Sequence, residues 1–304
     1  MPTNPHDKNQ VSSTQNKAVN WRLLALTIAA LFGFAANSLL CRLALRDGAI
    51  DALSFTVLRI VSGALVLSLL VLLQRGRLGG NWISAVALAT YALTFSLAYV
   101  SLSTGTGALI LFGCVQLTMI VVGLLQNERP APLAWIGLLI SLCALIALVA
   151  PGISAPPLLG ALLMAVAGIA WGAYSLRGRG VGNALENTAG NFLRACPLVL
   201  LIFVFKSDVH LSTNGVTCAL LSGVVASGFG YALWYSALPS LSAFRAATVQ
   251  LAVPVVAALG GIVFLGEVLT PRLALAGSAI LGGIILATLV KSRSVTTSHA
   301  AQKK

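Results

Sequence analysis

The sequence is poor in charged residues and poorest in acids. Of its 304 residues, 9% are charged and only 7 are Asp or Glu. A soluble domain carries roughly 25% charged residues, so a chain that is 58% hydrophobic has too little polar surface to cover itself in water. These proportions exclude a soluble enzyme or a soluble DNA-binding protein, and they indicate that lipid surrounds most of the chain.

Residue types that hold metals or build catalytic clusters are also scarce. The three histidines lie in tails or a loop, and the five cysteines lie in or beside apolar runs with no CxxC spacing. The residues concerned are His6, His210, His299, Cys41, Cys114, Cys143, Cys196 and Cys218. Such cysteines are typical of small buried apolar side chains. We therefore expect no metal site, no cofactor and no enzyme activity.

What the sequence has in abundance is long uncharged runs. A helix needs about 20 apolar residues to cross a bilayer. Charged residues bracket such runs at 22–42, 51–75, 77–128, 129–177, 186–206, 210–245, 245–267 and 272–291. The runs 77–128 and 129–177 are each long enough for two helices, with turns near 101–107 and 151–157. The sequence therefore predicts an all-α membrane protein with ten transmembrane helices.

The positions of Lys and Arg predict how the chain is oriented. The formal charge of +12 would suggest nucleic acid in a soluble protein. Here most basic residues fall in the two tails and in alternate loops, near residues 75, 129, 178 and 245. Positive loops remain in the cytoplasm, so we expect an inner-membrane protein with both termini cytoplasmic. The first 20 residues are polar, and no cleavable signal peptide is expected.

The two halves of the chain repeat several features in the same order. Asp51 precedes Arg59 by the same spacing as Glu186 precedes Arg194. A Glu also follows the fourth helix of each half, within 127–130 and at Glu267. Because five helices make a half, the second half is inverted relative to the first, as in many secondary transporters.

This repeat predicts the domain organisation. The ten helices are expected to form two inverted five-helix repeats around a central cavity. The expected segments are a cytoplasmic polar tail at 1–21, a first repeat at 22–150, a second at 157–290 and a basic cytoplasmic tail at 291–304.

With these features in view, the chain resembles the EamA family of the drug/metabolite transporter superfamily, over about residues 22–290. The resemblance rests on Phe55–Arg59, on its copy Phe192–Arg194, on Pro254 before Glu267, and on 277–283. Within the family the chain looks most like bacterial aromatic amino-acid exporters. The resemblance implies a basket of ten helices around a cavity that opens alternately to the two sides, with helices 3, 4, 8 and 9 prominent in its wall.

One position in the first half departs from the family pattern. Val115-Gln116 stands where the second half has Pro254-Val255, so the fourth helix is the more divergent copy. None of the matching motifs names a substrate.

Aromatic and amide residues inside the apolar runs are the candidates for a substrate cavity. Several recur at helical spacing, and polar groups within a membrane need a partner or a wet cavity. The candidates are Asn37, Ser38, Tyr91, Phe95, Tyr99, Gln116, Trp171, Tyr174, Tyr231, Trp234, Tyr235 and Gln250. Helix packing with satisfied polar groups remains the alternative for each. Trp21, Trp82 and Trp135, at helix starts, are typical of the membrane interface instead.

Arg59 and Arg194 are the two charges within the runs, and their insertion is costly. Each lies about 12 Å along its helix from the acid eight residues earlier, which is too far for a direct pair. Their matched positions favour a structural role, in which they bind helix-end carbonyls or snorkel. Binding of a substrate carboxylate is the alternative.

No acid lies deep in any run, although ion-driven carriers usually use one. We therefore expect movement of solute down its gradient, with Glu128 and Glu267, at helix ends, as remaining candidates for ion coupling. The leading hypothesis is an exporter of aromatic or other hydrophobic amino acids by alternating access. An exporter of another small metabolite or drug is the alternative, and a channel or a non-transport membrane protein is the alternative of another class. No nucleic-acid partner is expected.

Overall fold

The computed structural model describes residues 5–125, 132–152, 155–178, 182–204, 209–237, 240 and 249–289. Within these ranges the regular structure is helical, apart from one isolated bridge between Ile50 and Leu211. The prediction of an all-helical chain is confirmed. Glu128, Arg129, Arg245 and the predicted tail at 291–304 lie outside the described residues.

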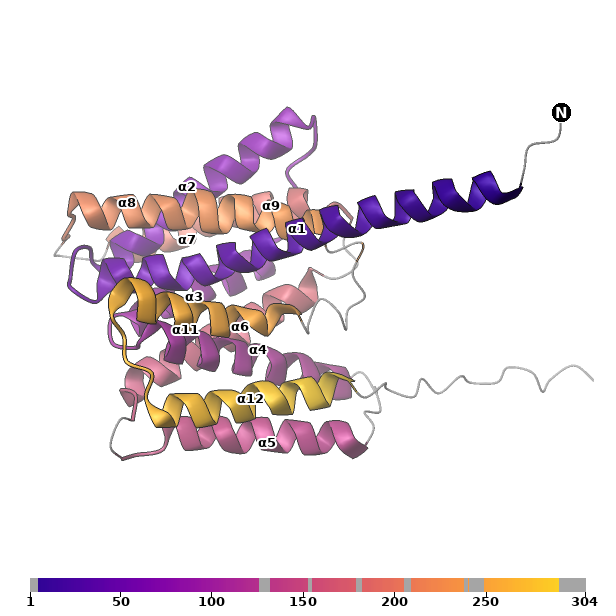
Figure 1. The fold of residues 1–304 in the computed structure, drawn as a ribbon. Coiled ribbons are helices and arrows are strands. Elements are labelled where there is room, and N and C mark those ends of the chain that lie inside the picture. Colours follow the sequence, from indigo (N-terminus) through magenta and orange to yellow (C-terminus); the bar gives the residue numbers. More distant parts are fainter. Residues whose placement is uncertain are drawn as a thin grey trace, which may run out of the picture.

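The helices follow one another with short connections and lie side by side in one bundle (Figure 1). Their bounds are α1 Pro5–Leu45, α2 Ala52–Leu73, α3 Trp82–Tyr99, α4 Thr104–Leu125, α5 Pro132–Val149, α6 Leu158–Arg177, α7 Ala184–Val204, α8 Thr213–Leu221, the π-helical segment η1 Ser222–Phe229, α9 Gly230–Ala237, α11 Ala252–Leu265 and α12 Pro271–Leu289. The turn expected at 101–107 is shorter than predicted, because α4 already begins at Thr104.

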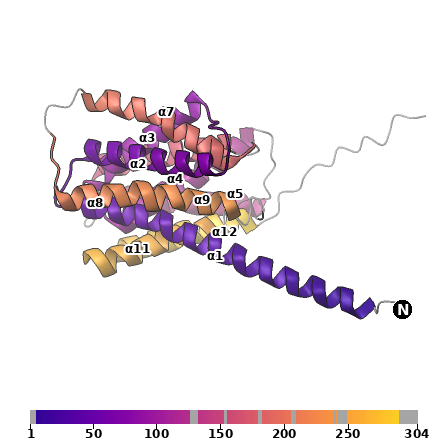
Figure 2. The same cartoon turned by 90° about the horizontal axis from the view of Figure 1, so that it is seen from above.

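Eight helical stretches in the described part of the chain are long and apolar enough to cross a membrane. One of them, Thr213–Ala237, joins α8, η1 and α9, and the apolar stretches Ala252–Leu265 in α11 and Pro271–Ala287 in α12 are shorter. Helix α1 begins at Pro5, within the polar tail predicted at 1–21, and the part of it that is apolar enough to cross a membrane is Trp21–Leu45. The start of α1 projects beyond the bundle in both views (Figures 1 and 2).

Many helix–helix contacts join the first half of the chain to the second, and a contact on one side often has a counterpart in which the two halves change places. Three pairs join helices that the predicted repeat would make equivalent, namely α2 with α7, α4 with α11 and α5 with α12. The contacts of α3 with α6 and α7 match those of the α8–α9 stretch with α1 and α2. The contact of α4 with α6 likewise matches that of α11 with α1. The core therefore lies between the halves.

Two loop contacts are reciprocal in the same way. At the start of α2, the amide of Asp51 donates to the carbonyl oxygen of His210 at 3.2 Å, and His210 lies shortly before α8. At the start of α7, the carbonyl oxygen of Glu186 accepts from the amide of Gly79 at 3.1 Å, and Gly79 lies shortly before α3. Each half thus ties its second helix to the segment that leads into the third helix of the other half.

Small residues bring the α5 and α12 backbones close together. A Cβ atom on Gly283 would lie 2.5 Å from Ser141 Oγ and 2.6 Å from the carbonyl oxygen of Gly137. The Ser141 hydroxyl donates to the carbonyl oxygen of Ile280 across the same contact, at 3.1 Å. Gly282 differs from its neighbour, because a Cβ atom there would meet no atom within 4 Å. Membrane helices commonly associate through such small residues and interhelical hydrogen bonds.

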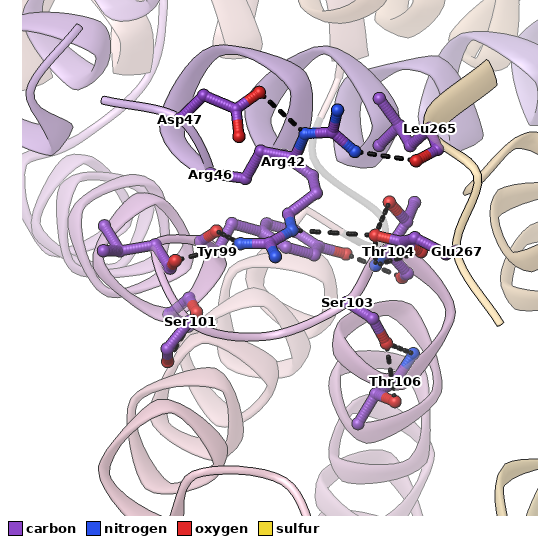
Figure 3. A network of polar contacts seen from close by, with 12 residues as sticks. Arg42, Arg46, Asp47, Tyr99, Ser101, Ser103, Thr104, Thr106, Leu265 and Glu267 are labelled. Atoms are coloured by element: carbon purple, nitrogen blue, oxygen red, sulfur yellow. Dashed lines mark hydrogen bonds and ion pairs between the residues drawn. The ribbon is translucent and has the colours of Figure 1, made fainter. Parts of the chain in front are cut away.

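A polar network ties four helix ends together at one end of the bundle (Figure 3). The Glu267 carboxylate accepts from the Thr104 amide at 2.9 Å and from its hydroxyl at 3.1 Å, so it caps the first turn of α4. Arg42, near the end of α1, lies 3.6 Å from this carboxylate and donates to the carbonyl oxygen of Tyr99 at 2.9 Å. Arg46 donates to the carbonyl oxygen of Leu265 at 2.7 Å. A carboxylate at a helix N-terminus is favourable because the helix dipole is positive there.

The contrast between neighbouring glycines predicts the effect of adding one methyl group. We expect Gly283→Ala to lower the free energy of unfolding by about 1–3 kcal/mol, because the Cβ atom must displace backbone atoms of α5. Gly282→Ala is the matched control, and we expect no loss there or a gain of up to about 1 kcal/mol. Thermal unfolding of the purified variants in detergent measures both. Equal melting temperatures for the two variants would contradict the close contact.

The Glu267 network predicts a second stability difference. We expect Glu267→Ala to lower the free energy of unfolding by about 1–3 kcal/mol, since it leaves the Thr104 amide uncapped and Arg42 without its carboxylate. Asp47→Ala is the control, because Asp47 is largely exposed and its pair with Arg46 is worth about 0–1 kcal/mol. The same unfolding assay tests both variants. If the Asp47 variant proved the less stable, the network would not stabilise the fold as described.

Candidate functional site

A cavity lies in the middle of the bundle, between the two halves of the chain. Its wall comes from α1, α3, α4, α6, η1 and α9, together with Gln250 just before α11. The lining residues are Phe34, Asn37, Ser38, Tyr91, Phe95, Leu111, Phe112, Trp171, Ala226, Ser227, Tyr231 and Gln250. The empty space, including its open mouth, is about 420 Å³. Little of it is wide enough for water, with room for roughly one or two molecules.

Aromatic rings in mutual contact form most of the cavity wall. Tyr91 stands at the centre of one group, with ring centroids 4.9 Å from Trp171 and 5.3 Å from Phe95. Tyr231 links this group to α1, with its centroid 5.3 Å from Trp171 and 5.8 Å from Phe34. The last two contacts are edge-to-face, an arrangement that aromatic quadrupoles favour. A flat solute that enters the cavity therefore meets ring faces and edges on several sides.

Polar groups cluster where α1 faces α3 and the π-helical segment. Asn37 donates its amide hydrogen to the Tyr91 hydroxyl at 3.3 Å and accepts from the Ser222 hydroxyl at 2.6 Å. The Tyr91 hydroxyl also accepts from Arg59 Nη2 at 3.0 Å. Since all four residues are buried, these bonds offset the cost of placing polar groups among apolar helices. The cavity wall therefore combines these polar groups with aromatic and other apolar side chains.

Seven of the residues predicted from the sequence lie in the wall of this cavity: Asn37, Ser38, Tyr91, Phe95, Trp171, Tyr231 and Gln250. Tyr174 and Tyr235 instead line a second, more polar cavity of about 340 Å³. This cavity lies at the bundle end where α3 begins and α6 ends, and it also contains Arg177. Trp171 separates the two groups, with its ring stacked 5.4 Å from that of Tyr174.

The other three predicted residues are buried outside the central cavity wall. Tyr99 packs against Phe95 and donates its hydroxyl hydrogen to the carbonyl oxygen of Thr104 at 3.3 Å. Trp234 packs against Phe34 on α1. Gln116 is 3% exposed, and its Nε2 atom has no partner in the described part of the chain. For Tyr99 and Trp234, the helix-packing alternative describes the contacts better than the cavity hypothesis does.

The two intramembrane arginines have different surroundings. Arg194 donates to the carbonyl oxygens of Gly190, at 2.9 Å, and Gly79, which is the arrangement expected of a structural arginine. Arg59 is 1% exposed and donates to Tyr91 and to the Ser227 hydroxyl, the latter at 3.3 Å. Its guanidinium neither reaches a helix-end carbonyl nor snorkels. Its hydrogen-bond partners are instead two residues of the cavity wall, and its predicted structural role stays a prediction.

Several wall residues were not predicted from the sequence. Phe34 is the clearest case, because it lies three residues before Asn37 and so shares its helix face. Ser227 lies in the π-helical segment, where ordinary helical spacing does not apply. Leu111, Phe112 and Ala226 carry no signal that separates them from other apolar residues. Among the described residues, no group of three or more His, Cys, Asp or Glu side chains is placed to hold a metal ion.

The chain is similar to a family profile and to several known proteins. The profile of the EamA-like transporter family matches residues 158–289. Uncharacterized protein PA1977 of Pseudomonas aeruginosa is 55% identical over 269 residues, which cover 87% of this chain and 94% of that protein. The uncharacterized transporter YwfM of Bacillus subtilis is 24% identical and covers 82% of this chain and 88% of its own length. The uncharacterized transporter YoaV of the same organism is 23% identical and covers 80% of this chain and 89% of its own length.

A solved structure has the same fold. A chain described only as "Crystal structure of protein" aligns with a TM-score of 0.61 over 86% of this chain and 98% of that one, at 24% identity. The family profile matches only the second half, whereas the resemblance was expected over both. The relatives nevertheless align over most of the chain, and two of them are described as transporters. Residues 158–289 thus match the EamA-like transporter family, and the similarity to proteins described as transporters extends over most of the chain.

Proposed function

We propose that this protein exports aromatic or other hydrophobic amino acids across the bacterial inner membrane by alternating access. The observation that carries the proposal is the central cavity, where Tyr91, Phe95, Trp171 and Tyr231 surround a narrow space that has polar groups on one side. Such a wall suits a solute with a flat apolar part and a polar end. Amino acids with aromatic side chains have this shape.

The aromatic wall gives a physical basis for selecting among amino acids. Offset or edge-to-face ring pairs contribute about 0.5–1.5 kcal/mol beyond the burial of their area. Two or three such contacts would favour tryptophan over alanine by about one to three orders of magnitude. Little of the space is wide enough for water, so the rings must separate to admit the solute.

The contacts between the halves support an alternating-access mechanism. The paired helix contacts and the reciprocal loop contacts at Asp51 and Glu186 fit ten spans arranged as two inverted repeats, 22–150 and 157–290. The cavity lies between these repeats, where inverted-repeat transporters bind their substrates. The network around Glu267 would then close the periplasmic end.

The positions of the acids support movement of solute down its gradient. The described acids Asp47, Asp51, Glu186 and Glu267 lie at or beyond helix ends. Carriers driven by protons or sodium usually place a carboxylate within a span. An outward gradient of the amino acid would supply the driving force.

Flux in liposomes that contain only the purified protein tests the proposed function. We expect exchange of labelled tryptophan with no ion gradient imposed, and stronger competition by tryptophan or phenylalanine than by alanine, by about tenfold or more. Equal competition by alanine and tryptophan would rule out aromatic selection and favour another metabolite. Flux that stops whenever proton and sodium gradients are collapsed would rule out simple downhill movement.

Two tryptophan variants locate the selectivity in the same assay. We expect Trp171→Ala to reduce the preference for tryptophan over alanine, because Trp171 contacts rings on both sides of the cavity. Trp82→Ala is the control, since Trp82 is an exposed residue at the start of α3. A preference that is unchanged in the Trp171 variant would show that the cavity wall has been assigned wrongly.

Cysteine labelling tests the orientation. We expect Gln10→Cys and Ala300→Cys, in a chain without its native cysteines, to react only with a reagent that reaches the cytoplasm, because positive segments remain inside. Val209→Cys is the control, and it should react from the periplasm because 209–212 precedes the eighth predicted helix. Labelling of either terminal cysteine from the periplasm would contradict the topology.

A further inference from the structure

Arg59 is a fully buried cation with one unsatisfied nitrogen. It lies within α2, is 1% exposed, and its guanidinium carbon lies 5.1 Å and 5.0 Å from the ring centroids of Tyr91 and Phe95. Nε donates to Ser227 and Nη2 donates to Tyr91, whereas Nη1 is buried without a hydrogen-bond partner in the described part of the chain. All three neighbours line the central cavity.

No carboxylate of the described residues balances this charge. The ion pairs found there join Arg42 to Glu267 and Arg46 to Asp47, both at helix ends. A buried charge without a counter-ion is strongly unfavourable, and the ring faces of Tyr91 and Phe95 offset only part of that cost. Arg194 differs, because backbone carbonyl oxygens accept from its guanidinium.

The two hydroxyl partners of Arg59 have donor hydrogens that remain available. The Tyr91 oxygen accepts from both Arg59 and Asn37, and the Ser227 oxygen accepts from Arg59. Each hydroxyl also has one hydrogen to donate, and neither donates to a protein acceptor within the described ranges. The cavity wall thus presents two hydroxyl donors next to a cation, which is an arrangement suited to an anionic acceptor.

We propose that Tyr91 and Ser227, with Arg59 behind them, form a subsite for the carboxylate of the transported solute. The carboxylate oxygens accept from the two hydroxyls, and the guanidinium supplies the opposite charge. This inference takes the central cavity of the proposed function as the substrate site, but it does not depend on an aromatic side chain. It assigns the substrate class as small carboxylates, including amino acids, and it excludes amines and amides that lack an anionic end.

Ligand-dependent melting of the purified protein in detergent tests the subsite. The probes are matched pairs: phenylalanine with phenylalaninamide, 3-phenylpropionate with phenethylamine, and leucine with leucinamide. A ligand that binds the folded state raises the melting temperature by an amount that grows with the logarithm of its concentration relative to its dissociation constant. We expect the carboxylate of each pair to bind about tenfold or more tightly than its partner, because charge-assisted hydrogen bonds are lost in the partner.

Variants distinguish the subsite from a general preference for acids. Arg59→Gln should bring the acid-to-amide ratio close to one, and Tyr91→Phe and Ser227→Ala should each lower it severalfold while amide binding is unchanged. Arg194→Gln is the matched control, and it should keep the wild-type ratio. If Arg59→Gln does not fold, the Tyr91 and Ser227 variants still decide the question, because each removes only one hydroxyl.

The outcomes separate this inference from the proposed function. If the leucine pair gives the same ratio as the phenylalanine pair and phenylalanine binds no better than leucine, the aromatic preference fails and the carboxylate subsite stands. If no carboxylate stabilises the wild-type protein more than its partner, the subsite is wrong. It is also wrong if both Tyr91→Phe and Ser227→Ala keep the full ratio.

Discussion

Helices surrounded by lipid gain little by hiding apolar surface from each other, so their association depends on close packing and on internal hydrogen bonds. This constraint explains where the small residues are. Gly283 lets the backbone of α12 approach that of α5, and Gly223 leaves no room for a side chain between η1 and the carbonyl oxygen of Arg59. Large apolar residues such as Leu73, Leu125 and Val263 are instead exposed on the outside, where lipid is expected.

The same constraint separates two kinds of polar group. At one end of the bundle, Glu267, Thr104 and Arg42 contact one another and a helix-end carbonyl, and these contacts hold the ends of α1, α3, α4 and α11 together. In the middle, Asn37 and its neighbours leave some bonding capacity unused, next to the only fully buried arginine among the described residues. Within the described residues, buried nitrogens without a hydrogen-bond partner thus occur both at the helix ends, at Arg42 Nε, and beside the cavity, at Arg59 Nη1.

The sequence predicts the helices well because charges and apolar runs mark their ends directly. Asp51 begins α2 as expected, and its side chain caps the first turn. Helical spacing also places Tyr91 and Phe95 on the face that lines the cavity, but it places Tyr99 on that face too, although Tyr99 bonds to the start of α4. Helical spacing shows which residues share one face of a helix, but it does not show how far along that face the cavity extends. The capping of α4 by Glu267 joins residues far apart in the chain, so no local pattern predicts it.

The π-helical segment between α8 and α9 determines which way α9 faces. An α-helix advances by 3.6 residues per turn, so each residue that a π segment adds to a turn rotates everything beyond it by about 100° relative to an unbroken α-helix. Tyr231 and Trp234 follow this segment directly. Conversion of Ser222–Phe229 to regular α-helix would therefore turn both rings away from Phe34 and from the α3–α6 side, while α8 stayed in place. The position of Tyr231 in the cavity wall, and that of Trp234 against Phe34, therefore depends on the π-helical segment that precedes them.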